Sequence, residues 1–156
     1  MKLSGQVKIE VGSDNKLTLE HLKNYLADSL RQEEAKHVET ANDNINFKVG
    51  IFRPFANWKI LACISSGTII LRSEKQAISV NYKLSFNYLI IIASLMILFI
   101  FLLDLNRYMG NQSKMAFLAL AWAFLVFGNI IIIAFRFPRF IKKCAASASK
   151  IEYIKT

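Results

Sequence analysis

Two long runs without a charged residue constrain the fold of this chain more than any other feature. Residues 84–103 form a run of 20, and residues 115–135 form a run of 21. At about 1.5 Å rise per residue, either run makes a helix of roughly 30 Å, which is the thickness of a bilayer's hydrocarbon core. The pattern predicts a transmembrane hairpin with spans at 84–103 and 115–136, joined by a short non-cytoplasmic loop at 104–114.

The positive charge is concentrated near these runs. Residues 1–83 carry 12 Lys and Arg against 9 Asp and Glu, whereas residues 84–156 carry 8 against 2. An excess of cations beside apolar spans favours anionic lipid headgroups over nucleic acid as the partner. The anionic surface of a bilayer is therefore an expected partner, and nucleic acid is not.

Basic residues also predict the orientation, because cytoplasmic flanks are enriched in Lys and Arg. The link at 104–114 holds Arg107 and Lys114, whereas the two outer flanks are richer in cations. The first five residues contain no apolar segment of a signal peptide, so the first span would direct insertion. We expect an integral protein of a bacterial inner or cell membrane, with two spans and both termini in the cytoplasm.

Residues 1–83 predict a small cytoplasmic α+β domain. Leucines spaced by three and four residues, after a candidate N-cap at Thr18, predict an amphipathic helix at 18–36. Alternating apolar and polar residues predict strands before and after it. The expected strands are 5–11, 37–40, 45–51, 58–64, 67–72 and 78–86.

Short turns between most of these strands make neighbouring strands antiparallel. The expected fold class is α+β, a small antiparallel sheet of about five strands with one amphipathic helix on one face, followed by the transmembrane hairpin. Leu61, Cys63, Ile69 and Leu71 lie out of phase with their neighbours, which predicts that some strands are apolar on both sides. The remaining residues, 137–156, would form a basic cytoplasmic tail after Pro138 ends the second span.

Aromatic and basic residues occur together at two places where a membrane interface is expected. One is the loop around Pro54, where closure of the domain core is the alternative role for the aromatic residues. The other follows the second span, where ordinary flanking charge is the alternative to a lipid site. The candidate interface residues are Phe52, Arg53, Phe55, Trp58, Arg136, Arg139, Lys142 and Lys143.

Polar or small residues inside the apolar runs are candidates for helix–helix contact. Ser94 lies near the middle of the first run, and Gly128 and Asn129 lie in the second. A side-chain amide in hydrocarbon needs a partner, which the other helix or another subunit could supply. Neither run contains a charged residue, which argues against an ion pathway or proton relay.

The sequence contains no phosphate-binding loop, dinucleotide-binding motif or nucleophile elbow. Glu34 and His37 have a metal-like spacing, but the motif occurs once and at a helix end, so a solvated terminus is the preferred interpretation. Cys63 with His21 or His37 is the remaining nucleophilic pair, and no supporting motif accompanies it. We therefore expect no catalytic residue, no metal and no cofactor.

Three functions remain open. The first is a binding or scaffolding module, or an accessory subunit of a membrane assembly, with other membrane subunits or a second copy of the chain as partners. The second is a membrane-anchored sensor that binds a lipid or small molecule in the sheet domain. The third is a membrane-bound enzyme that uses Cys63 or the acidic residues Glu33, Glu34 and Glu39.

Overall fold

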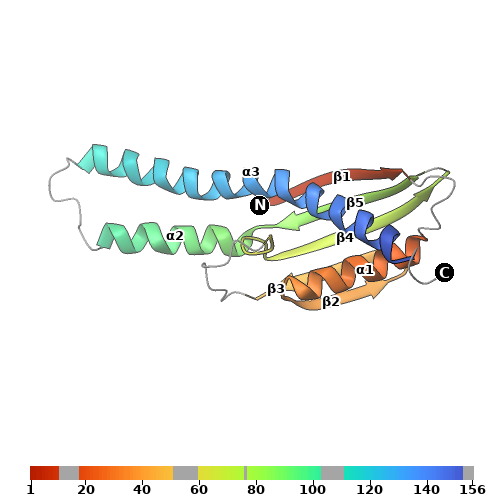
Figure 1. The fold of residues 1–156 in the computed structure, drawn as a ribbon. Helices are drawn as coiled ribbons and strands as arrows, with labels where there is room; N and C mark the ends of the chain where they lie inside the picture. Colours follow the sequence, from red (N-terminus) through yellow and green to blue (C-terminus); the bar gives the residue numbers. More distant parts are fainter. Residues whose placement is uncertain (11–17, 51–59, 76, 103–110, 153–156) are drawn as a thin grey trace.

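The computed structural model describes residues 1–10, 18–50, 60–75, 77–102 and 111–152. It shows an α+β protein with one five-stranded antiparallel sheet and three helices among these residues (Figure 1). The elements are β1 (Lys2–Glu10), α1 (Leu19–Gln32), β2 (Ala35–Ala41), β3 (Asn44–Val49), β4 (Ser66–Glu74), β5 (Ala77–Ser85), α2 (Asn87–Leu102) and α3 (Asn111–Glu152).

The sheet confirms the α+β class and the antiparallel sheet of the expected fold, but not the two-span hairpin. Its strand order is β1-β5-β4-β3-β2, and every neighbouring pair is antiparallel. The strands β2 to β5 follow one another as a meander, while β1 joins the outer side of β5. Helix α1 therefore carries the chain from one edge of the sheet to the other.

Local sequence signals account for α1 and for the strands around it. The Thr18 hydroxyl accepts a hydrogen bond from the His21 amide at 3.2 Å, which satisfies a free N–H group at the helix start. Leu22, Leu26 and Leu30 are fully buried on the face that meets the sheet. Alternation in β3 likewise buries every second residue, as expected for a strand with one face on the core.

The core lies between one face of the sheet and two helices, not one. The second helix is the C-terminal part of α3, which packs against α1 and β1. Its residues Phe137 and Ile141 are fully buried, and the Phe137 ring lies 5.0 Å from the ring of Tyr82 in β5. The segment expected to be a basic tail is thus part of the domain core, because every third or fourth residue of it is apolar or small.

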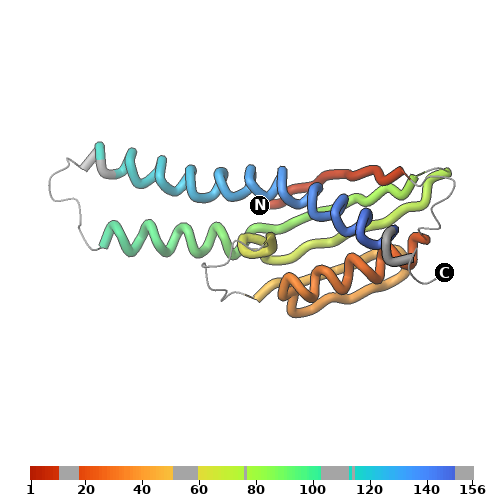
Figure 2. Tube along the Cα trace, in the orientation of Figure 1, coloured from red at the N-terminus to blue at the C-terminus, as the bar shows by residue number. Residues whose placement is uncertain are grey.

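Helix α3 continues through Pro138, where the sequence led us to expect its end. Proline removes one backbone hydrogen bond from a helix interior. The buried residues on both sides of Pro138 hold the helix against the sheet and offset this loss. Both traces show α3 beginning beside α2 and ending over the sheet and α1 (Figures 1 and 2).

Two boundaries differ from the expectation for the same physical reason, namely packing against distant strands. The first span was expected to start at residue 84, but β5 ends at Ser85 and α2 starts at Asn87. Leu84 belongs to the strand because its side chain is fully buried at an inward position of the alternation. Residues 60–63 form a turn, not the expected strand. Leu61 and Ile64 enter the core from this turn, with the Ile64 amide donating to the Leu61 carbonyl at 3.1 Å.

The described residues contain one helix that is long and apolar enough to cross a bilayer, whereas the sequence led us to expect two. The stretch Met115–Ser149 of α3 meets this criterion, and only 22% of its most apolar window is buried. Helix α2 is apolar but has 16 residues, or about 24 Å at the rise of an α-helix. Residues 103–110, which would complete the expected span and loop, lie outside the described residues.

Candidate functional site: the open face of the sheet

The face of the sheet opposite α1 and α3 is polar. Its residues line up in rows across the strands, because paired residues on neighbouring strands point to the same side. The row nearest α2 runs Lys2, Ser85, Ser66, Lys48 and His37. We call this surface the open face.

A second row lies one step further from α2 and is also polar. It runs Ser4, Lys83, Thr68, Asn46 and Glu39. At these two rows the strands are apolar on the core side alone, although Ile70 in the next row of β4 lies on the open face. The core side of β4 carries Ile69 and Leu71. Both of those residues are fully buried on the core face.

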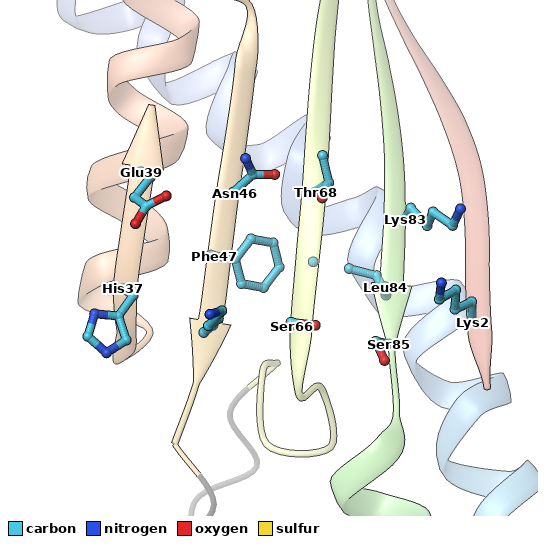
Figure 3. Close-up of a pocket in the computed structure, with 12 residues that line it drawn as sticks. Lys2, His37, Glu39, Asn46, Phe47, Ser66, Thr68, Lys83, Leu84 and Ser85 are labelled. Carbon is cyan, nitrogen blue, oxygen red and sulfur yellow. The ribbon is translucent and has the colours of Figure 1, made fainter. Parts of the chain in front are cut away.

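The two rows line a shallow depression of about 670 Å³. Figure 3 shows Lys2 and Lys83 on adjacent strands at one side of it, and His37 and Glu39 at the other. Ser66 and Thr68 lie between them on the central strand β4, and Ser85 lies on β5 with Lys83. Hydroxyl groups thus occupy the middle of the depression, with two lysines on one flank and a histidine and a carboxylate on the other.

The electrostatics of this depression favour an anion. Lys2, Lys48 and Lys83 are exposed, and none has a carboxylate partner within ion-pair distance among the described residues. Glu39 is the one acidic residue of the lining. Ammonium groups beside hydroxyl donors suit phosphate or carboxylate oxygens, which accept hydrogen bonds.

The end of the sheet nearest α2 is held together by Ser65. Its amide donates to the Ser85 carbonyl at 2.8 Å, and its carbonyl accepts from the Val49 amide at 2.9 Å. Its hydroxyl accepts a hydrogen bond from the Tyr88 amide at 2.8 Å, in the first turn of α2. A helix start leaves such amides without an intrahelical partner, so Ser65 caps α2 from a distant segment.

The three candidates for helix–helix contact have different surroundings. Ser94 in α2 accepts a hydrogen bond from Trp122 Nε1 in α3 at 3.1 Å, which joins the two helices. Asn129 instead accepts a hydrogen bond from the Cys63 thiol at 3.4 Å, and its amide nitrogen donates to the Leu125 carbonyl at 2.6 Å. A side chain added at Gly128 would meet no atom within 4 Å.

The candidate interface residues fall into two groups. Arg136, Arg139, Lys142 and Lys143 are all exposed on α3, along the part of the helix that packs on the sheet. Phe52, Arg53, Phe55 and Trp58 lie outside the described residues. The basic residues of α3 therefore project from a folded domain and not from a tail.

The residues considered for catalysis come from different elements, with His21 on α1, His37 on β2 and Cys63 in the turn at 60–63. Glu33 and Glu34 lie at the end of α1, whereas His37 and Glu39 lie on β2, so the Glu34–His37 spacing is not helical. Burial raises the pKa of the Cys63 thiol, which lowers its thiolate fraction at neutral pH, the reverse of an activated nucleophile. In the described ranges, no group of three His, Cys, Asp or Glu residues could hold a metal ion.

Comparison with known proteins assigns neither a family nor a function to this chain. No protein-family model matches the chain, and neither a curated protein nor a solved structure matches it.

Sequence reasoning did not identify the open face as a site. Lys2, Lys48 and Lys83 each occupy the polar position of an alternating strand, where solvated charge is ordinary. Strand alternation could place each lysine on the polar side. The strand order and register were needed to bring the three together.

Proposed function

We propose that this chain is a small integral membrane protein whose α+β domain lies against the cytoplasmic surface of the bilayer. The domain acts as a binding or scaffolding module, or as an accessory subunit, of a membrane assembly. Helices α2 and α3 form a two-span hairpin in this proposal. The observation that carries it is the apolar surface of these two helices where they extend beyond the sheet (Figure 1).

That surface is exposed on both helices. Phe99 and Leu102 in α2 are 61% and 70% exposed, and Leu120 and Phe124 in α3 are 70% and 79% exposed. Monomeric soluble proteins rarely expose contiguous apolar surface of this extent. A bilayer would cover these side chains without a second protein.

The helices are fixed to the domain without a flexible linker. Phe86 alone separates β5 from α2, and α3 passes from the apolar projection into the core as one helix. Ser65 and Asn129 add hydrogen bonds at this junction. The domain would therefore keep a fixed height and tilt at the membrane surface, as suits a module that presents a binding face.

Membrane fractionation tests the insertion. We expect the chain to stay in the membrane fraction after an alkaline carbonate wash and to leave it in detergent. Leu120→Asp with Phe124→Asp should prevent stable insertion, since a charged residue at the centre of a span costs about 3 kcal/mol. Thr40→Asp on the exposed edge strand β2 is the matched control and should leave insertion unchanged. Recovery of the native chain in a detergent-free supernatant would contradict the proposal.

The module role has a separate test. Purification from its native membrane in mild detergent should yield a complex larger than one chain with its detergent. A stable monomer without a companion would count against a scaffolding or accessory role.

A second candidate function is a sensor that binds a ligand on the open face. The observation in its favour is the depression between Lys2, Lys83 and His37, which none of the described elements covers. Because the depression is polar, its ligand would be an anion and not a hydrocarbon. Loss of anion binding on substitution of Lys83 would be the first expected result.

A further inference from the structure

We propose that the end of the open face nearest α2 binds the phosphate of an anionic lipid headgroup. The site consists of Lys2 and Lys83 with the hydroxyls of Ser66 and Ser85, and Lys48 lies in the same row on β3. This inference rests on the proposed insertion of α2 and α3. It assigns to the domain a class of ligand and the residues that contact this ligand.

The donors of this site converge on one small area. Lys2 pairs with Ser85, and Lys83 pairs with Ser4, so Lys2 and Lys83 are diagonal neighbours on β1 and β5. Diagonal neighbours in an antiparallel pair lie about 7–8 Å apart, a distance that two long ammonium side chains bridge around one phosphate. Figure 3 shows the two lysines on adjacent strands, with Ser85 beside Lys2 and Ser66 one strand further away on β4. A phosphate at this position would contact hydrogen-bond donors, whereas the acidic Glu39 lies across the depression on the edge strand β2.

Along the direction of the strands, these lysines lie level with the part of α3 where exposed apolar residues give way to exposed basic residues. Ile131, Ile132 and Phe135 are 56%, 45% and 65% exposed, and the exposed Arg136 and Arg139 follow. The contact between Phe137 and Tyr82 aligns this part of α3 with β5 beside Lys83. Cations on both sides of the sheet therefore lie at one level, just beyond an apolar surface.

The depth of the site also matches a headgroup layer. Ser85 is two residues before the start of α2, so the first row lies directly at the proposed membrane boundary. The second row, with Lys83, lies about 7 Å further along the strands. Each headgroup region of a bilayer is roughly 5–8 Å thick, so both rows fall within it.

Continuity with the membrane selects a lipid over other anions. An inserted hairpin holds the first row among phosphates at a local concentration that no soluble anion matches. Each lysine near an anionic surface contributes about 1 kcal/mol of attraction. A lipid phosphate therefore fits both the charge and the position of the site.

Lysine footprinting of the intact chain tests this site. The protein is placed in nanodiscs of phosphatidylcholine alone, or of phosphatidylcholine with phosphatidylglycerol, and lysines are acetylated and quantified by mass spectrometry. We expect Lys83 and Lys2 to react several-fold more slowly in discs with phosphatidylglycerol, while Lys8 at the far end of β1 is unchanged. Inorganic phosphate added to discs of phosphatidylcholine alone should not reproduce this protection.

A matched pair of variants gives a second readout. Lys2→Gln with Lys83→Gln should lower the phosphatidylglycerol retained in native mass spectrometry by about fivefold for each lysine removed. Lys8→Gln with Lys75→Gln removes the same charge from the far end of the sheet and should retain the lipid.

Each other outcome overturns the site. Absence of protection, equal protection of Lys8, or equal protection by inorganic phosphate would each do so. Failure of the protein to travel with the nanodisc would instead contradict the proposed insertion, so the two failures are distinguishable.

Discussion

At the scale of single residues, Gly67 shows how closely this core is packed. A β-carbon at Gly67 in β4 would overlap the ring of Phe47 on one neighbouring strand and approach Leu84 on the other. The Phe47 ring thus occupies the space that a side chain at position 67 would need. Gly128 in α3 has no such neighbour.

We expect Gly67→Ala to lower the free energy of unfolding by about 1–3 kcal/mol, because the added methyl group displaces a buried ring. Thermal unfolding in mild detergent, followed by circular dichroism, measures this. Gly128→Ala is the matched control, and it should not destabilise the protein, since alanine is the better helix former. Equal melting temperatures for both variants would show that Phe47 does not pack over Gly67.

At the scale of elements, α3 has two environments along one helix. Its N-terminal part lies beside α2, with Trp122 bonded to Ser94. Its C-terminal part lies on the sheet and on α1, where Phe137 and Ile141 are fully buried. The helix therefore joins the apolar projection to the domain core as one continuous element.

Ile141→Ala should destabilise the domain by about 2–5 kcal/mol, the usual cost of truncating a buried isoleucine. Its exposed neighbour provides the control: Lys142→Ala should change stability by no more than about 0.5 kcal/mol. Denaturant unfolding of both variants in mild detergent makes the comparison. If residues 137–152 were a loose tail, the two substitutions would have the same small effect.

At the scale of the whole molecule, the proposed insertion and the arrangement of elements together predict a membrane topology. Because the C-terminal part of α3 packs on the sheet, both would lie on the same side of the bilayer. The start of α3 at Asn111 lies at the far end of the projecting helices (Figure 1). The excess of Lys and Arg around the domain favours the cytoplasm for the domain side.

Cysteines introduced by Thr40→Cys and Lys142→Cys should therefore react with an impermeant maleimide in inside-out vesicles and not in intact cells. Asn111→Cys should show the reverse accessibility. The native thiols at Cys63 and Cys144 should give little background, because burial raises the pKa of each. Labelling of positions 40 and 142 from opposite sides would contradict the fold.

Much of the architecture could be predicted from local patterns. Alternation identified β1, β3 and β5, and leucine spacing with the Thr18 cap identified α1. These signals are local because each depends on a periodicity of two or 3.6 residues within one element. The apolar character of α2 and α3 was equally plain from the sequence.

The sequence by itself thus determined α1, most of the strands and which segments are apolar, but not the turn at 60–63 or the helix beyond Pro138. The tertiary structure alone decided that residues 137–152 complete the core across Pro138, that Ser65 caps α2, and that three lysines gather on one polar face. These features depend on contacts between distant positions, such as the pairing of Lys2 with Ser85. Local periodicity carries no information about which strands become neighbours or in what register, so such contacts appear only when the chain is folded.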